Sequence, residues 1–261
     1  MTSVTRAFFY RSIIRYPDDM AHPKRRFSMR AMLCSILILV GTTMAAAICQ
    51  QPPGNQDEKT GLPRVLIIGD SISIGYTPFV KEALKGRAKV SHNPGNAQHT
   101  GTGLKKIDQW LGNESWDVIH FNWGLWDLCY RDPPGSLKRG KENGRISIEI
   151  DQYQKNLEKL IIRLKKTGAK LIWASTTFVP QGETGRKMGD DLRYNEVARK
   201  LMKKHRIPIN DLHAASAGFP GELFRAAGDV HFKPEGRKKL ASLVTVRIVE
   251  ALNGSEQSDD H

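Results

Sequence analysis

The sequence predicts an α/β domain with a five-stranded parallel sheet that is covered by helices on both faces. Between about residues 62 and 253, short apolar runs alternate with stretches of helical periodicity. The first run, VLIIG (65–69), is apolar as far as its final glycine, which is typical of a strand buried on both faces. Strands that alternate with helices at this spacing pair in parallel, and their crossover helices cover both sides of the sheet.

The first half of the region supplies three of the five strands. A helix is expected after each of the first two strands, and Gly86 and Gly112 follow these helices as suitable C-caps. The third strand, WDVIHFNWG, has apolar residues at positions 118, 119 and 121. The expected elements are strands at 65–69, 88–91 and 116–124, with helices at 76–85 and 104–111.

The second half begins with a charged segment rich in Pro and Gly, residues 131–147, which we interpret as an exposed loop. Pro234 suits the first turn of the last helix, whose apolar residues recur on one face. The remaining expected elements are helices at 153–166, 192–205 and 234–252, strands at 169–180 and 207–211, and a loop at 182–189.

The amino terminus resembles a secretory signal. Residues 1–30 are basic, residues 31–49 carry no charge, and the apolar run ends in Ala45-Ala46-Ala47. We expect cleavage after Ala47 and export to the periplasm, the cell surface or the medium. The alternative is a retained membrane anchor, because the apolar run of 18 residues approaches the length that spans a bilayer. A lipid anchor on Cys49 is disfavoured by the bulky Ile48 before it.

The chain therefore divides into four parts. These are a signal peptide or anchor at 1–49, a polar linker at 50–63, the folded domain at 64–253 and a polar tail at 254–261. If the signal is cleaved, no stable membrane insertion is expected.

Charge and cysteine content exclude several classes. The net charge is +13, but Lys and Arg are scattered over helix positions without interleaved aromatic residues, so we expect no nucleic-acid partner. Only Cys129 lies in the predicted domain, which excludes a disulfide within it. No Cys/His pattern indicates zinc, and we expect neither a metal nor a cofactor.

Two segments carry candidate chemistry. Gly69-Asp70-Ser71 follows the first strand, where a serine hydroxyl lies at the edge of the sheet that binds ligands. By itself this triplet is weak, since a serine there also caps helices. The second segment, GDVHFKPEG (228–236), places His231 just before the last helix, from where it can face the first strand–helix turn.

Together the two segments resemble the SGNH (GDSL-type) hydrolase family. Its first sequence block is Gly-Asp-Ser, and its last is Asp-x-x-His followed by an aromatic residue, Pro, Glu and Gly. The resemblance extends from Val65 to Leu252 and implies a flavodoxin-like, three-layer α/β/α sandwich. It also implies that Ser71 is the nucleophile and that His231 is the general base.

The acidic residue departs from the family pattern. The family's acid stands three residues before the histidine, which is Gly228 here, whereas Asp229 stands two before it. We take Asp229 as the candidate acid and expect a poor alignment, so that Asp229→Asn would lower turnover only about ten- to a hundredfold, less than the roughly 10⁴-fold loss in a well-aligned triad. The alternative is a Ser–His pair oriented by another group.

The oxyanion donors also depart from the pattern. The family's Gly-x-Asn-Asp block matches residues 124–127, with Trp126 in the Asn position, and Gln98 takes the place of the glycine in its second block. Candidate replacement donors are Gln98, Asn96 and Asn122. Trp123 and Trp126 are candidates for stacking on a substrate, unless one of them packs in the core.

These observations predict an exported serine esterase that hydrolyses a carboxylic ester through an acyl-enzyme. Its partner would be a small-molecule or glycan ester, for example an acetyl ester on a carbohydrate. The main alternative is a catalytically degenerate domain that binds a glycan through the same pocket. A lipase or thioesterase is a third option, although no long apolar lid segment is present.

Overall fold

The computed structural model describes residues 61–132 and 139–254 of the 261-residue chain. The segment interpreted as a signal or anchor, residues 1–49, lies outside the described residues. The same holds for residues 50–60 of the linker and residues 255–261 of the tail.

The centre of the domain is a parallel sheet of five strands, as predicted. The strand order is β2-β1-β3-β6-β7, so that the first strand lies inside the sheet and the chain proceeds outward from it in both directions. The strands are β1 (Arg64–Ile68), β2 (Lys89–His92), β3 (Val118–Phe121), β6 (Lys170–Ala174) and β7 (Ile209–Asn210).

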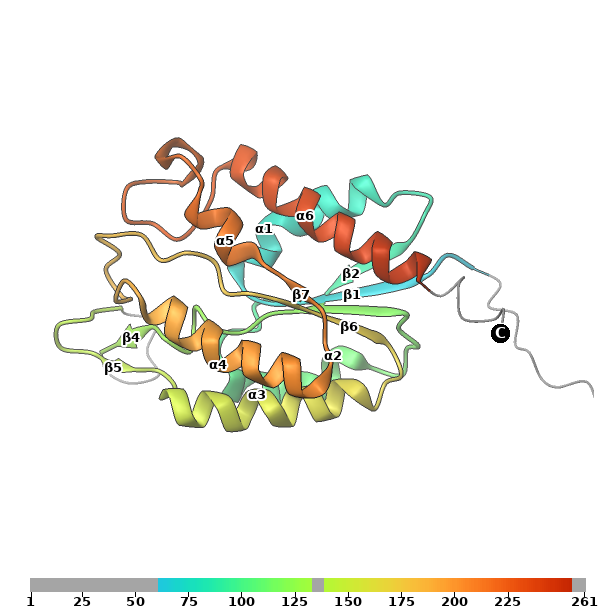
Figure 1. The fold of residues 1–261 in the computed structure, drawn as a ribbon, viewed down its shortest axis with the longest axis horizontal. Coiled ribbons are helices and arrows are strands. Elements are labelled where there is room, and N and C mark those ends of the chain that lie inside the picture. The colour runs from blue at the N-terminus through green and yellow to red at the C-terminus, as the bar shows by residue number, and fades with distance from the viewer. Residues whose placement is uncertain (1–60, 133–138, 255–261) are drawn as a thin grey trace, which may run out of the picture. The chain divides into compact units, whose positions relative to one another are not determined.

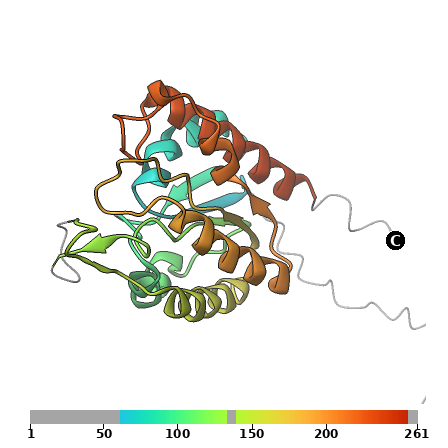
Figure 2. The same cartoon turned by 60° about the vertical axis from the view of Figure 1, so that its left-hand side comes forward.

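Helices cover both faces of this sheet and complete a three-layer α/β/α sandwich (Figures 1 and 2). One layer contains α1 (Ser71–Ala83), α5 (Leu212–Ala217) and α6 (Pro234–Asn253). The other layer contains α2 (Thr100–Leu111), α3 (Ile150–Lys165) and α4 (Asp190–His205). The predicted fold class is therefore confirmed.

Several element boundaries differ from the prediction. Helix α1 begins at Ser71 rather than at residue 76, because the Asp70 carboxylate accepts a hydrogen bond from the Ile72 N–H and caps the helix there. The segment expected to be a loop contains a small antiparallel pair, β4 (Tyr130–Arg131) and β5 (Arg145–Ile146). Sequence periodicity also missed the short helix α5 and a 3₁₀ turn at Gly221–Leu223.

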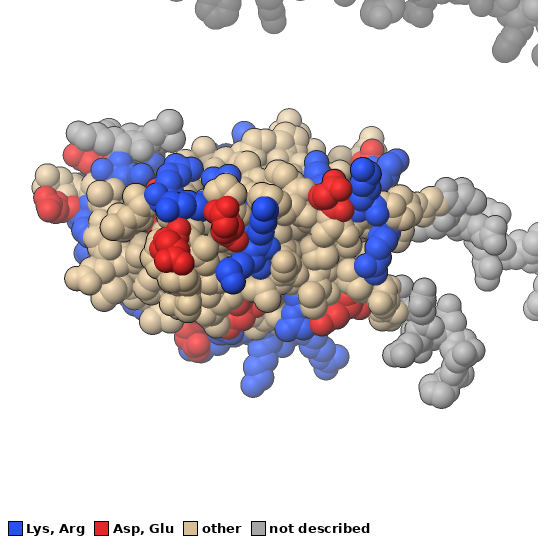
Figure 3. Space-filling view, turned by 90° about the horizontal axis from the view of Figure 1, so that it is seen from above, with Lys and Arg blue, Asp and Glu red and all other residues tan. Residues whose placement is uncertain are grey.

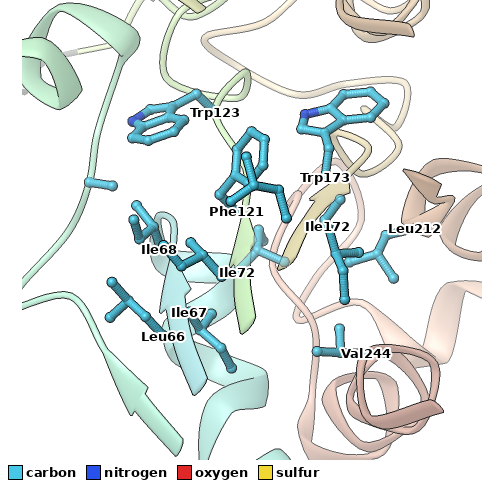
Figure 4. Close-up of a cluster of buried hydrophobic side chains, with 14 of the residues drawn as sticks. Leu66, Ile67, Ile68, Ile72, Phe121, Trp123, Ile172, Trp173, Leu212 and Val244 are labelled. Carbon is cyan, nitrogen blue, oxygen red and sulfur yellow. The ribbon is translucent and has the colours of Figure 1, made fainter. Parts of the chain in front are cut away.

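The core lies on both sides of the sheet. Val65, Ile67 and Ile68 of β1 have no exposed surface, which explains the apolar run that follows Arg64 in this strand. In Figure 4, Phe121 of β3 lies between Ile68 of β1 and Trp173 of β6. Burying a side chain of this size contributes about 1.5–3 kcal/mol, so this cluster fixes the strands whose carboxyl ends carry the site.

The surface carries mixed charge. On the face seen in Figure 3, Lys and Arg side chains are interspersed with Asp and Glu. Within the described part of the chain, no helix is both long and apolar enough to cross a bilayer. The same residues contain no group of three or more His, Cys, Asp or Glu side chains arranged to hold a metal ion.

Candidate active site

Ser71 is the first residue of α1, and only Gly69 and Asp70 separate it from the carboxyl end of β1. Its side chain is partly buried. Backbone N–H groups in the first turn of a helix have no acceptor within that helix, and the helix dipole favours negative charge there. The position therefore supplies a hydroxyl and an anion-stabilising backbone in the same turn.

His231 faces this hydroxyl from the loop that leads into α6. Its Nε2 atom lies 2.9 Å from Ser71 Oγ, a hydrogen-bond distance between residues 160 positions apart in the sequence. The loop is held by a bridge between Phe224 and Phe232 and by the Arg225 N–H, which donates to the His231 carbonyl at 2.8 Å. The histidine is therefore positioned by backbone pairing on both sides.

Asp229 is aligned with the imidazole, so the expectation of a poor alignment is wrong. Its Oδ1 lies 2.6 Å from His231 Nδ1 and also accepts the His231 backbone N–H at 3.0 Å. Partial burial raises the pKa of Asp229, but the hydrogen bonds from the backbone and ring of His231 outweigh it and hold the pKa below the ordinary value. The carboxylate is thus ionised at neutral pH and fixes the imidazole with Nε2 toward the serine.

Gly228 explains why the acid moved by one position. It has a φ of +72°, and a Cβ placed there would lie 2.8 Å from the carbonyl carbon and oxygen of Gly182. A side chain at position 228 would clash at this contact, whereas Asp229 at the next position reaches the imidazole through a two-residue turn. Gly182 lies in a loop braced by the buried ion pair between Glu183 and Arg186, 3.0 Å apart. Sequence reasoning missed the contact between Gly228 and Gly182, because only the fold brings this loop against residue 228.

The turns expected to hold the oxyanion meet beside Gly69. The Gly69 N–H donates to Asn93 Oδ1 at 2.9 Å, and the Gly69 carbonyl accepts the Ala97 N–H at 3.0 Å. The Asn122 N–H donates to the carbonyl of Ile68. The three turns that follow β1, β2 and β3 are therefore linked by hydrogen bonds at one edge of the sheet.

Two of the candidate donors at this edge already have acceptors. Asn122 Nδ2 donates to the Ala174 carbonyl at 2.7 Å, and the Gln98 N–H donates to Asn96 Oδ1 at 2.8 Å. Gln98 has a φ of +53°, a left-handed conformation that glycine adopts without strain. That Gln98, Asn96 or Asn122 donates to an oxyanion remains a prediction. For the Asn122 side chain and the Gln98 backbone N–H, it would require the present hydrogen bond to rearrange.

The two tryptophans differ. Trp123 is only 1 % exposed and packs on Gly103 of α2, so the prediction that it offers a stacking surface is wrong. Trp126 is partly buried, and the Arg131 guanidinium lies 4.2 Å from its ring centroid. A role for Trp126 in substrate contact stays a prediction.

Asp127 anchors the turn that carries Gln98. Its Oδ1 accepts hydrogen bonds from the Thr100 N–H at 2.8 Å and the Thr100 hydroxyl at 2.5 Å. The carboxylate is fully buried, and this burial raises its pKa to about 7 despite the two hydrogen bonds. The other oxygen, Oδ2, has no hydrogen-bond partner among the described residues. A buried, titratable carboxylate therefore holds the turn at the sheet edge where the oxyanion is expected.

Ser71, His231 and Asp229 form a hydrogen-bonded series at the carboxyl edge of the parallel sheet. This arrangement in an α/β/α sandwich is typical of serine hydrolases. Solved structures similar to this chain include an acetyl xylan esterase, a lipase/acylhydrolase, a GDSL-like lipase and an SGNH hydrolase. The chain has the fold of the SGNH hydrolases, as the sequence resemblance implied.

Three of these structures show the extent of the likeness. An acetyl xylan esterase is 17% identical with a TM-score of 0.59, over 71% of this chain and 99% of that one. A lipase/acylhydrolase from Enterococcus faecalis is 22% identical with a TM-score of 0.59, over 72% and 95%. A GDSL-like lipase from Bacteroides thetaiotaomicron is 15% identical with a TM-score of 0.55, over 72% and 88%. No protein-family model and no curated protein sequence matches this chain.

Proposed function

We propose that this protein is a serine esterase that hydrolyses a carboxylic ester through an acyl-enzyme on Ser71. The observation that carries the proposal is the continuous hydrogen-bonded chain from Ser71 Oγ to His231 at 2.9 Å and from His231 to Asp229 at 2.6 Å. This arrangement activates a hydroxyl that is otherwise a weak nucleophile.

In the first half-reaction, Ser71 Oγ bonds to the ester carbonyl carbon while its proton moves to His231 Nε2. The Asp229 carboxylate stabilises the imidazolium that forms. When the tetrahedral intermediate collapses, the bond to the alcohol oxygen breaks and Nε2 returns the proton to that oxygen. The products of this step are the free alcohol and an acyl group on Ser71.

In the second half-reaction, a water molecule gives a proton to Nε2 and attacks the acyl carbon. Collapse of this intermediate releases the carboxylic acid and restores the serine hydroxyl. The negative charge on the intermediate is stabilised by the backbone N–H of Ser71 at the start of α1. A second donor would come from the turn at 96–98, where the Gln98 backbone N–H donates to Asn96 Oδ1 in this structure.

A serine-directed fluorophosphonate tests the nucleophile directly. We expect the purified protein to be labelled on Ser71, and Ser71→Ala to abolish both labelling and p-nitrophenyl acetate hydrolysis. The melting temperature of the variant should remain nearly unchanged, since the hydroxyl is partly exposed and contributes little packing. Retention of wild-type turnover by Ser71→Ala would show that the nucleophile is another residue. A folded protein that neither labels nor turns over would favour the alternative of a glycan-binding domain.

We also propose that the protein is exported, on the strength of the basic, apolar and small-residue segments before residue 48. Amino-terminal sequencing of the protein from its native cells should find a mature chain that begins near Ile48. An intact 31–49 segment in the isolated protein would replace cleavage by anchoring.

A further inference from the structure

A cavity of about 390 Å³ opens beside Ser71 and His231, between α1 and the segment that leads into α6. This volume falls in the range of small-molecule sites. None of the oxyanion candidates, Gln98, Asn96 or Asn122, lines it. The cavity therefore lies on the imidazole side of the nucleophile, away from the turns at 93–98 and 122–124.

The side of the cavity decides which part of an ester it can hold. The imidazole must give its proton to the leaving alcohol oxygen, so the alcohol lies next to His231 Nε2 while the carbonyl oxygen points toward the oxyanion donors. A cavity that is bordered by His231 and not lined by Gln98, Asn96 or Asn122 suits the alcohol part of the substrate.

The lining of the cavity combines an apolar wall with fixed positive charge. Ile74, Phe79 and Phe232 supply apolar surface, and Ile74 is 43% exposed. Apart from His231, the charged side chains among the described lining residues are Arg225 and Arg237. A neutral alcohol would use only the apolar wall, whereas an anionic alcohol would also use both guanidinium groups.

Arg237 is held in place by two features. Its Nε donates to the Phe232 carbonyl at 2.8 Å, and its side chain crosses Gly75, where an added Cβ would lie 3.2 Å from the arginine Cδ and Nε. Glycine inside a helix costs about 1 kcal/mol relative to alanine, and α1 carries this cost where the arginine passes.

Arg225 stands next to the base. Its backbone N–H donates to the His231 carbonyl, and its Nε lies 4.0 Å from Asp229 Oδ2. Because this pair is long and the Arg225 side chain is 58% exposed, the guanidinium keeps most of its capacity to bind a further anion.

We infer that the cavity binds the alcohol part of the ester and that this alcohol carries an anionic oxygen group, a carboxylate or a phosphate. The inference rests on the proposed function for the direction of the ester, but the binding of the anion does not require turnover. Guanidinium groups match both oxyanions, because they offer paired donors in a planar fork and keep their charge at all accessible pH values.

Two acetyl esters of similar shape test the inference. In 4-acetoxybenzoate the leaving phenol carries a carboxylate, and in 4-acetoxybenzamide it carries a neutral amide. After normalisation to the hydroxide-catalysed rates, we expect kcat/KM to be about tenfold higher for the charged ester, and the preference to shrink as salt is added. Arg237→Gln and Arg225→Gln should each lower the preference severalfold, whereas Arg237→Lys should retain part of it. Lys239→Gln, which removes an exposed charge from α6 outside the cavity, is the matched control.

A succinate half-ester of 4-hydroxybenzamide places the negative charge on the acyl side instead. Preference for this ester over both others would overturn the assignment of the cavity to the alcohol. Equal normalised rates for the two acetyl esters would overturn the anionic subsite while leaving the esterase intact. 4-Acetoxybenzyl phosphate, compared with 4-acetoxybenzyl alcohol, then separates a phosphate from a carboxylate preference.

Calorimetric titration with the product alcohols separates failure of this inference from failure of the proposed function. We expect 4-hydroxybenzoate to bind more tightly than 4-hydroxybenzamide and Arg237→Gln to reduce the difference severalfold. If no ester is hydrolysed but this difference is found, the esterase proposal fails and the anion subsite stands. Equal affinities, or no binding of either phenol, would overturn the subsite whatever the enzyme does.

Discussion

The base side and the oxyanion side of Ser71 both depart from the SGNH sequence pattern, but the fold compensates for the departure on the base side only. On the base side, the acid is displaced by one residue, and the turn at Gly228 returns Asp229 to within 2.6 Å of the imidazole. On the oxyanion side, the asparagine position is Trp126, and the nearby Asn122 amide is bound to the carbonyl of Ala174.

The difference shows which changes in sequence a local change of the backbone can compensate. A carboxylate needs only to reach one ring nitrogen, so a tight turn with one glycine compensates for a shift along the chain. An oxyanion donor must point an unpaired N–H at one place in space. An amide already bonded to a buried carbonyl cannot do this without leaving that carbonyl unsatisfied.

The largest effect that tests this comparison is expected for Asp229→Asn. Because the acid is well aligned, the substitution should lower kcat by about 10³- to 10⁴-fold, the range of a working triad acid that loses its charge. Steady-state kinetics with p-nitrophenyl acetate measure the change. Asp132→Asn, outside the triad, serves as the control. A loss of only ten- to a hundredfold would mean that the hydrogen bond contributes less than its geometry suggests.

On the other side, Asp127 gives a pH-dependent effect on stability. Burial raises its pKa from 3.8 to about 7, so the folded state binds a proton that the unfolded state releases between about pH 4 and 7. The contribution of Asp127 to the free energy of unfolding is therefore at its maximum below pH 4 and is lost as the pH rises through 7. One pKa unit corresponds to about 1.4 kcal/mol, so the loss is on the order of a few kcal/mol.

Asp127→Asn keeps an acceptor for Thr100 and removes the charge, so the variant should lose less stability than the wild type between pH 5 and pH 8. Urea unfolding at the two pH values measures this difference. Glu82→Gln changes a solvent-exposed acid of α1 and is the control. An identical pH dependence in Asp127→Asn and wild type would contradict the assignment.

The smallest effect is expected for Asn122→Ala. Loss of its hydrogen bond leaves the Ala174 carbonyl without this donor and should lower the free energy of unfolding by about 1–2 kcal/mol. Turnover should fall less than tenfold, whereas removal of a working oxyanion donor costs about 10²- to 10³-fold. A hundredfold loss of kcat with unchanged stability would show that Asn122 turns toward the oxyanion during the reaction, and the two sides of the site would then be equally intact.

Much of the fold could be predicted because it depends on local patterns. The apolar run at β1 and the amphipathic repeat of α3 each reflect burial that the sequence shows directly. The ends of the elements were harder to predict from periodicity. The start of α1, for example, depends on the hydrogen bond from the Ile72 N–H to the Asp70 side chain. The short pair β4–β5 escaped prediction because two-residue strands have no periodicity to detect.

The sequence by itself determined the fold class and identified Ser71 and His231, because each lies in a contiguous motif next to a regular element. Only the tertiary structure decided that Asp229 lies within hydrogen-bond distance of His231, that Trp123 is buried and that Arg225 and Arg237 share a cavity with Ser71. These outcomes depend on contacts between segments far apart in the chain, such as Gly228 against Gly182 and Arg237 across Gly75. A close approach of two backbones, or of a side chain to a helix, leaves no periodic trace in either segment alone, and its consequences appear only when both are packed together.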